Sequence, residues 1–216
     1  GYMIMELDSG RSTECEYWDV ALSAGHYSFG LANDDLHYPD RSDKIARRCS
    51  FLASPTATWE DICRTLKEGA YYSMRIPDYG NGDWRVKYAK NRELPRITAI
   101  GITDNTTIYM ALSKSAERVV VYGQDHRMLM ATTDADSIYY TLPTDEPYAR
   151  LVAYFSTGEV IYTNPFARYD KATSDYPTTN SEHSVNITLT ILYNLFLVVL
   201  FGTSIVAISK LWHRSK

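Results

Sequence analysis

Hydrophobic and polar positions in the first part of the chain follow two different periods. Residues 3–7 and 26–32 have short apolar runs of the length of buried strands, whereas residues 14–24 repeat apolar side chains at helical spacing. Gly25 stands where that helix should end. The order strand, helix, strand predicts a βαβ unit, whose two strands pair in parallel through a right-handed crossover.

A second helix is predicted between two further strand-like runs, at residues 49–53 and 70–76. Thr58 is followed three residues later by Asp61, which is the spacing of a capping box. Gly69 is a typical helix stop. The helix should therefore begin at Thr58 and end just before Gly69.

The pattern changes after residues 78–84, which are rich in Gly, Asn and Asp and predict a turn region. Short alternating runs separated by turn residues follow, and six of them have the pattern of strands: 97–102, 106–112, 118–122, 137–142, 148–155 and 160–163. We therefore predict an α/β domain over residues 1–85 and a small antiparallel β-sandwich over residues 86–168.

The end of the chain has the pattern of a transmembrane helix. Residues 185–209 carry no charged side chain, and at about 1.5 Å per residue they can cross a hydrocarbon core of about 30 Å. The basic tail at residues 210–216 predicts a cytoplasmic C-terminus, with the preceding domains on the extracytoplasmic side. Residues 169–184, rich in Thr, Ser, Asp and Pro, would form the stalk.

Composition narrows the range of partners. A formal net charge of −4 argues against a general nucleic-acid binder, because no basic field is present to attract phosphates. The three cysteines, Cys15, Cys49 and Cys63, have no C-x-x-C spacing. They indicate neither a disulfide framework nor a zinc site. The partner that we expect is the lipid bilayer, because of the uncharged apolar run at residues 185–209.

The stretch with the clearest candidate chemistry is G-L-A-N-D-D-L-H-Y-P, from Gly30 to Pro39, which follows the second predicted strand. Asp35 and His37 are two residues apart, so on an extended backbone their side chains leave the same face. A carboxylate and an imidazole there could bind one divalent ion. The same residues also fit a turn or a helix cap, which is the more common outcome on spacing alone. Their position after a parallel strand favours a functional site.

Other motifs accompany this stretch. M-E-L-D-S-G and E-Y-W-D-V-A-L-S-A-G-H precede it, K-E-G-A-Y-Y-S follows it, and Y-A-R-L-V-A-Y with G-E-V-I-Y-T-N-P-F come later. Together they resemble the last part of a PHP domain, the polymerase and histidinol phosphatase family, with the β domain that often follows it in bacterial members. The resemblance covers roughly Met3 to Arg168, and D-x-H and T-N-P are its most specific parts.

The resemblance implies a distorted (β/α)7 barrel that hydrolyses phosphoesters at a cluster of two or three metal ions. It implies that Asp35 and His37 are metal ligands, with zinc, manganese or iron as the candidate ions. Asp34 would orient His37 or its neighbours, and Glu6 matches a position that is commonly acidic. Arg75 either faces the substrate phosphate or is a structural or solvated arginine.

The family's other ligands, an H-x-H motif and further His and Glu residues, have no counterpart in this chain. The S-T-G-P turn of relatives is also replaced, by S-M-R-I-P at residues 73–77. Two ligands cannot hold a catalytic cluster, so we expect the chain to be the C-terminal part of a longer, membrane-anchored phosphoesterase and to be inactive by itself. The alternative is a non-catalytic surface protein, in which a degenerate barrel and the sandwich bind a partner or a glycan.

Overall fold

The computed structural model describes residues 3–11, 14–38, 40, 42–79, 83–169, 172 and 186–214. The chain divides into two compact units, Gly1–Glu182 and His183–Lys216. We describe each unit by itself.

The first unit begins with the predicted βαβ arrangement. Strand β1 (Ile4–Asp8) pairs in parallel with β2 (Phe29–Ala32), and α1 (Glu14–Ser23) connects them. Trp18 of α1 is fully buried, and its indole N–H donates to the Ser28 carbonyl at 3.1 Å. These observations confirm the strand, helix, strand order and the parallel pairing.

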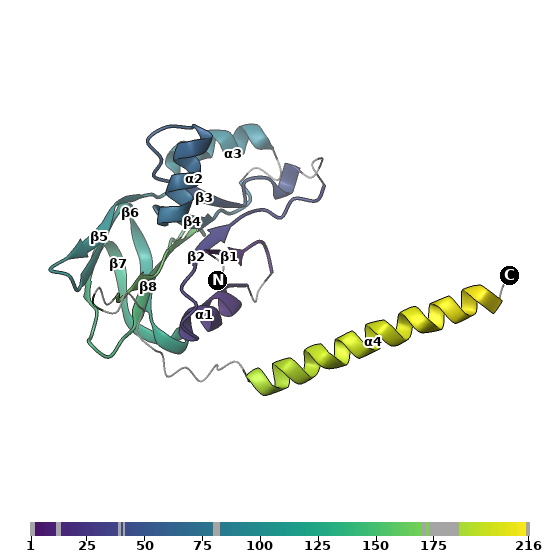
Figure 1. Cartoon of the computed structure of the whole chain (residues 1–216). Coiled ribbons are helices and arrows are strands. Elements are labelled where there is room, and N and C mark those ends of the chain that lie inside the picture. Colours follow the sequence, from purple (N-terminus) through teal and green to yellow (C-terminus); the bar gives the residue numbers. More distant parts are fainter. Residues whose placement is uncertain are drawn as a thin grey trace. The chain divides into compact units, whose positions relative to one another are not determined.

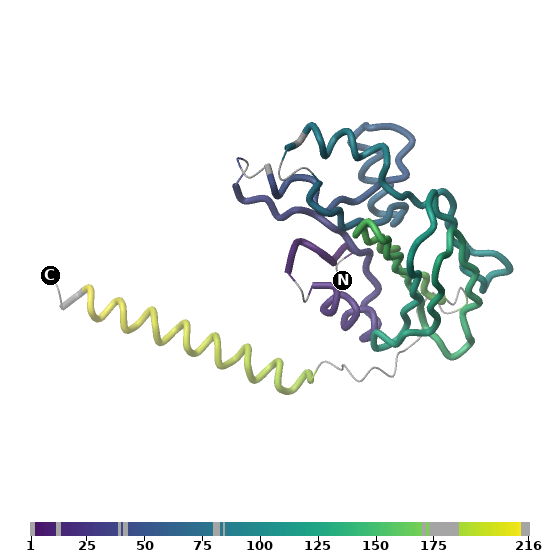
Figure 2. Tube along the Cα trace, turned by 180° about the vertical axis from the view of Figure 1, so that it is seen from behind, coloured from purple at the N-terminus to yellow at the C-terminus, as the bar shows by residue number. Residues whose placement is uncertain are grey.

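The remaining strands form one antiparallel sheet, which curls into a half-barrel (Figures 1 and 2). Its order is β3-β4-β9-β8-β6-β5, and in addition β7 pairs with β6 and β10 pairs with β8. The strands are β3 (Arg48–Leu52), β4 (Tyr71–Arg75), β5 (Ile97–Thr103), β6 (Thr107–Tyr122), β7 (Met128–Thr141), β8 (Tyr148–Tyr154), β9 (Val160–Thr163) and β10 (Phe166–Ala167).

This sheet crosses the boundary that we expected near residue 85. Strands β3 and β4 precede that position, yet β4 pairs with β9, with Arg75 opposite Val160. A single curled sheet therefore stands where we expected a separate sandwich over residues 86–168. The cause is a pairing between strands about 90 residues apart, for which local hydrophobic patterns give no signal.

A buried cluster joins the βαβ unit to the sheet. It combines Leu7, Trp18 and Leu22 from β1 and α1 with apolar side chains of β8 and β9: Tyr148, Val152, Val160 and Tyr162. A larger apolar cluster fills the inside of the curled sheet. The first cluster packs β1 and α1 against β8 and β9.

Helix α2 (Trp59–Glu68) confirms the predicted capping. The Thr58 side chain accepts a hydrogen bond from the Asp61 amide, and Gly69 ends the helix in the left-handed conformation at φ 67°. Helix α3 (Trp84–Lys90) was not predicted, because we interpreted its first residues as part of a turn region. Asp83 caps it by accepting from the Arg85 amide.

Three short 3₁₀ helices complete the first unit: Ser42–Lys44, Asn91–Glu93 and Gln124–His126. Two predicted strands, 106–112 and 118–122, are one strand in the structure, β6. Its pairing with β7 shifts between Ala111 and Ala116 and then resumes. A polar stretch that we interpreted as a break is thus an irregularity within one long strand.

The second unit contains helix α4 (Ile187–Arg214), which is long and apolar enough to span a membrane between Ile187 and Trp212. This confirms that the apolar run forms a single helix of membrane-crossing length. The predicted stalk, residues 169–184, lies almost wholly outside the described residues. The last two residues of the predicted basic tail do so as well.

Candidate metal and substrate site

Asp35 and His37 lie together on the loop that follows β2. The His37 Nδ1 atom is 2.7 Å from the Asp35 carbonyl oxygen and 3.7 Å from Asp35 Oδ1. The two side chains are 45% and 70% exposed, respectively. The extended backbone that we assumed is not kept, because Asp35 has φ 45°. The loop itself, rather than strand alternation, brings the two predicted ligands side by side.

The contact between His37 and the Asp35 carbonyl decides which ring nitrogen is available. A carbonyl oxygen can only accept, so Nδ1 donates its proton there and Nε2 keeps a lone pair in the neutral imidazole. Histidines that bind metals commonly donate their second N–H to a carbonyl or a carboxylate in this way. Nε2 is therefore the ring nitrogen of His37 that can accept a hydrogen bond.

Asp34 contacts the backbone at the start of β3. Its carboxylate accepts hydrogen bonds from three consecutive backbone amides, those of Ala46 at 2.5 Å, Arg47 at 2.8 Å and Arg48 at 2.7 Å. No contact between Asp34 and His37 occurs among the described residues. Asp34 holds the start of β3 against the end of β2, and so fixes the loop on which both candidate ligands lie.

Replacing Asp34 by alanine should therefore lower the free energy of unfolding by about 2–4 kcal/mol, because three amides lose a charged acceptor. Chemical denaturation followed by tryptophan fluorescence measures this change. The matched variant is Asp145→Ala, an exposed aspartate that should change the free energy of unfolding by less than about 0.5 kcal/mol. Similar small losses in both variants would show that the three amide contacts do not stabilise the loop.

Glu6 connects to the same loop through Asn33. The Asn33 amide donates to Glu6 Oε1 at 2.5 Å, and its oxygen accepts from the Asp35 amide at 2.8 Å. The carboxyl end of β1 is thereby tied to the loop after β2. Asn33 is a positioning residue, and the sequence offered no signal for this role beyond its place in the polar stretch.

Two cations lie beside the candidate ligands. A pocket of roughly 290 Å³ is lined by Asp35 and His37 together with Lys44 and Arg48. Arg48 donates through Nε to Asp8, which is almost fully buried, at 2.6 Å. This ion pair fixes Arg48 at the pocket wall.

Arg75 lies in an adjoining pocket instead of beside Asp35 and His37. That pocket has a volume of roughly 310 Å³ and is lined by Arg11, Arg48 and Arg75, with Asp8 on the same wall. Within the described part of the chain, Arg11 and Arg75 form no ion pair. Arg48 lines both pockets, so the two pockets adjoin each other.

The described residues contain no group of three or more His, Cys, Asp or Glu side chains arranged to hold a metal ion. Asp35 and His37 thus remain a pair. The three cysteines are free thiols, and burial raises the pKa of Cys15 and brings that of Cys49 to about 11. For Cys15 and Cys49, burial therefore favours the protonated thiol, as expected of packed cysteines.

A buried ion pair that the sequence did not indicate forms between α1 and β8. Arg150 is fully buried and donates to both carboxylate oxygens of Asp19, at 2.6 and 2.5 Å. His126 is exposed over about half of its side chain, contacts Asp19 through Nδ1 and stacks on Tyr122. Burial opposes ionisation of Asp19, but the contacts from His126 and Arg150 outweigh it and lower its pKa.

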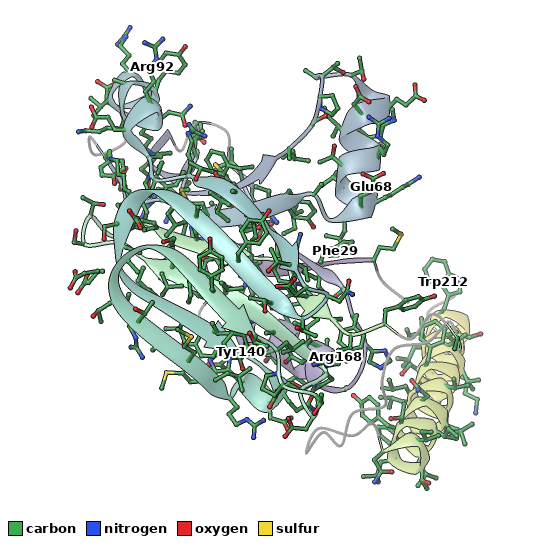
Figure 3. The ribbon with its side chains drawn as sticks, turned by 90° about the vertical axis from the view of Figure 1, so that its left-hand side faces the viewer. Phe29, Glu68, Arg92, Tyr140, Arg168 and Trp212 are labelled. Carbon is green, nitrogen blue, oxygen red and sulfur yellow. The ribbon has the colours of Figure 1, made fainter. Side chains whose placement is uncertain are left out.

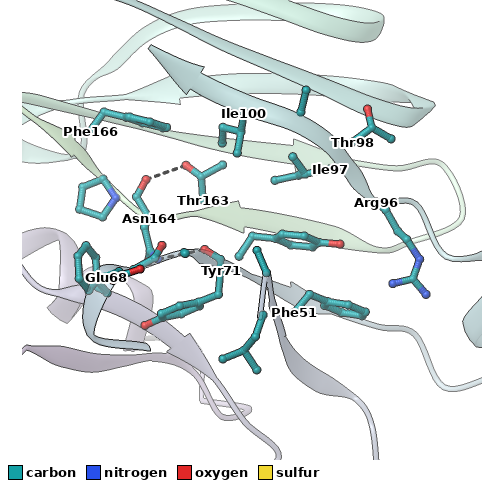
Figure 4. A pocket seen from close by; sticks show the side chains of 18 residues that line it. Phe51, Glu68, Tyr71, Arg96, Ile97, Thr98, Ile100, Thr163, Asn164 and Phe166 are labelled. Atoms are coloured by element: carbon teal, nitrogen blue, oxygen red, sulfur yellow. Dashed lines mark hydrogen bonds between the residues drawn. The ribbon is translucent and has the colours of Figure 1, made fainter. Parts of the chain in front are cut away.

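Another pocket, of roughly 730 Å³, is lined by residues of β3, β4 and β5 and by the T-N-P segment (Figure 4). Its base is organised by Asn164, from the T-N-P motif. The Asn164 side chain accepts from the Gly30 amide at 2.9 Å and donates to the carbonyls of Gly69 at 2.9 Å and Tyr71 at 3.0 Å. One side chain thus connects β2, the end of α2 and β4.

No protein-family model matches this chain, and a search of curated proteins finds no significant match.

Proposed function

We propose that the chain contributes two metal ligands, Asp35 and His37, to a membrane-anchored phosphoesterase of PHP type. The observation that carries this proposal is the pairing of Asp35 with His37, in which Nδ1 is engaged by a carbonyl and Nε2 is left for a ligand. Both residues follow a parallel strand whose partner, β1, ends nearby at Glu6 and Asp8. Carboxylate and imidazole together suit zinc, manganese or iron.

These residues fit a metal in kind but not in number, so further ligands have to come from protein segments outside the described residues. Strand β1 pairs only with β2 in the described part of the chain. Two-stranded parallel sheets are rarely found alone. Additional parallel strands on the free edge of β1 would extend the pair toward a β/α barrel and bring their carboxyl ends close to Asp35 and His37.

Positive residues stand among the carboxylates of the site. Lys44 and Arg48 beside the ligands, and Arg11 and Arg75 in the adjoining pocket, offer donors to phosphoryl oxygens. A bound metal supplies Lewis acidity and lowers the pKa of a water molecule. The contribution of this chain is to hold the ligands, to orient His37 and to neutralise the phosphoester charge.

Helix α4 would anchor this activity at a membrane. The basic residues at its end, beginning with Lys210, favour a cytoplasmic C-terminus, which would place the first unit outside the cytoplasm. Protease treatment of intact cells tests this orientation. A tag at the C-terminus should be protected from the protease.

A second candidate function is supported by the 730 Å³ pocket, which is lined mainly by aromatic and aliphatic side chains. Large apolar pockets with a few polar groups are typical of ligand-binding sites. This observation favours a binding role, which can exist with or without hydrolysis.

Hydrolysis of p-nitrophenyl phosphate and its diester by the protein purified from its native membrane tests the proposal. We expect activity that a chelator removes and that manganese or zinc restores. Asp35→Asn and His37→Ala should each lower kcat/KM about 100-fold or more, since loss of even an outer partner of a metal ligand costs about 10–100-fold.

Two matched variants control for local disturbance. Asp104→Asn changes an exposed aspartate that, like Asp35, has a positive φ, and His26→Ala removes another exposed histidine. Both should keep full activity. Chelator-insensitive hydrolysis, or equal activity in all four variants, would refute the metal-site assignment.

A further inference from the structure

The 730 Å³ pocket lies between the two terminal strands of the curled sheet, which do not pair with each other. We call this gap the seam. Its lining includes residues 51–53, at the end of β3, and residues 96–100, at the start of β5. These are the two terminal strands in the sheet order. Because side chains in a strand alternate between faces, a run of consecutive residues can line one pocket only along the strand edge. The pocket therefore lies against the edges of both strands.

Strand β5 has an edge without the usual protection. It pairs only with β6 in the described part of the chain. Its sequence, I-T-A-I-G-I-T, has no charged residue and no proline, which are the common means of blocking edge pairing. Ile100 and Ile102 are 39% and 51% exposed. Beyond Ile97, whose backbone hydrogen-bonds with Tyr72, this edge is available to an added strand.

The walls of the pocket suit apolar side chains. The rings of Phe51 and Tyr72 are stacked with centroids 5.2 Å apart, and Phe29 meets Tyr71 edge to face at 6.4 Å. Phe29 lies close to Glu68 beside the sheet, at the end of α2 (Figure 3). A volume of roughly 730 Å³ is in the range of pockets that bind small ligands, and it suits a few side chains of an extended segment.

Opposite charges mark the two ends of the pocket. Glu68 and Arg96 lie at opposite ends in Figure 4. The Arg96 guanidinium lies 5.2 Å from the Phe51 ring centroid and donates to the Asn91 carbonyl at 2.9 Å. Neither Glu68 nor Arg96 forms an ion pair with another described residue. An occupant with a negative group at one end and a positive group at the other would complement them.

We propose that this seam binds an extended peptide segment of a partner protein, which adds as a strand to the free edge of β5. Alternate apolar side chains of the peptide enter the aromatic pocket, an acidic residue lies near Arg96 and a basic residue lies near Glu68. Edge strands that lack protection bind peptides in this manner, with main-chain hydrogen bonds giving affinity and pockets giving specificity. The seam is bounded by β3 and β5, so it admits one extended segment, whereas a folded second copy would bring the rest of its sheet into the same space.

Selection from a displayed library of random seven-residue peptides, against the full chain in lipid nanodiscs, tests the proposal. We expect enriched peptides to alternate apolar and polar residues and to carry an acidic residue toward one end. The Kd of the consensus peptide is then measured by fluorescence anisotropy. Methylating its backbone nitrogens one at a time should weaken binding at every second position, because only alternate amides face β5.

Three variants localise the binding. Ile100→Lys should weaken the consensus peptide about tenfold or more, as expected for a central contact of an interface. Tyr139 on β7, which is 67% exposed, provides the control. Tyr139→Lys should leave the Kd of the consensus peptide unchanged. Arg96→Gln should weaken the peptide with its acidic residue and leave the corresponding amide peptide unaffected.

Several results would overturn the proposal. They are a library without enrichment, a consensus without alternation, equal affinity in the Ile100→Lys and unaltered chains, and methylation effects without a period of two. Concentration-dependent dimerisation that Ile100→Lys abolishes would assign the edge to a second copy instead. Circular dichroism and thermal unfolding confirm that each variant is folded before binding is measured.

Discussion

Replacing Arg150 by methionine is expected to lower the free energy of unfolding by about 3–5 kcal/mol, which is the usual cost of removing one partner from a buried ion pair. Arg150 is fully buried and Asp19 is 3% exposed, so the variant leaves a carboxylate in the protein interior. Among the described residues, His126 is the other side chain that contacts this carboxylate. Urea denaturation of the intact chain in detergent, followed by tryptophan fluorescence, measures the loss.

Arg127→Met provides the matched control. Arg127 also pairs with a buried carboxylate, that of Glu146, but its own side chain is 62% exposed. We expect this variant to lose clearly less stability than Arg150→Met, because exposed members of ion pairs contribute little. Adding Asp19→Leu to Arg150→Met should recover part of the loss, since no charge is then left unpaired. A loss below about 1 kcal/mol in Arg150→Met would contradict the assigned role.

The same cluster predicts a particular dependence on pH. Because the pKa of Asp19 is lowered in the folded protein, its contribution to stability is present above the unfolded value of about 3.9 and is lost as pH falls through the folded value. In Arg150→Met the charge of Asp19 destabilises the folded state instead. The difference in stability between the two proteins should therefore narrow as the solution becomes acidic.

Replacing Asn164 by alanine is the second large effect that we expect, a loss of about 2–4 kcal/mol in the free energy of unfolding. Three buried or half-buried backbone groups lose their partner at once: the Gly30 amide and the carbonyls of Gly69 and Tyr71. Each typical hydrogen bond contributes about 1 kcal/mol, and unsatisfied groups cost more. Thermal and chemical unfolding of the variant measure the change.

Asn91→Ala is the corresponding control, because Asn91 is exposed and has helical backbone angles that alanine accepts. It should change stability by less than about 0.5 kcal/mol. Asn164→Asp should not rescue the loss, since it keeps an acceptor for Gly30 but directs a carboxylate at two carbonyls. If Asn164→Ala were as stable as Asn91→Ala, the T-N-P motif would not hold β2, α2 and β4 together.

Local features of the fold could be predicted because their causes are local. Periodicity located β1, α1 and β2, and the side chains of Thr58 and Asp61 located the start of α2. The apolar run without charges located α4. In each case the residues that decide the structure lie within a few positions of one another.

Features that depend on distant residues could not be predicted. The pairing of β4 with β9 joins strands from the two predicted domains in one sheet. The ion pair between Asp19 and Arg150 joins residues 131 positions apart. Neither position carries a sequence signal, because a lone aspartate or arginine is usually solvated.

The candidate site likewise has local features that could be predicted and contacts with distant residues that could not. Proximity in sequence correctly indicated that Asp35 and His37 lie together, although a turn rather than an extended backbone brings this about. The partners of Asp34 were not predictable, since they are amides 12 to 14 residues away. The anchoring of Asp35 to Glu6 through Asn33 likewise depends on β1.

Pulsed electron paramagnetic resonance of the protein loaded with manganese tests the central assignment most directly, because it detects histidine nitrogen bound to the metal. The proposal predicts a coupled nitrogen that is missing from the His37→Ala spectrum and present in the His26→Ala spectrum. Asp35→Asn should weaken manganese binding without removing that nitrogen. An identical nitrogen signal in the unaltered protein and in His37→Ala would show that His37 is not a ligand.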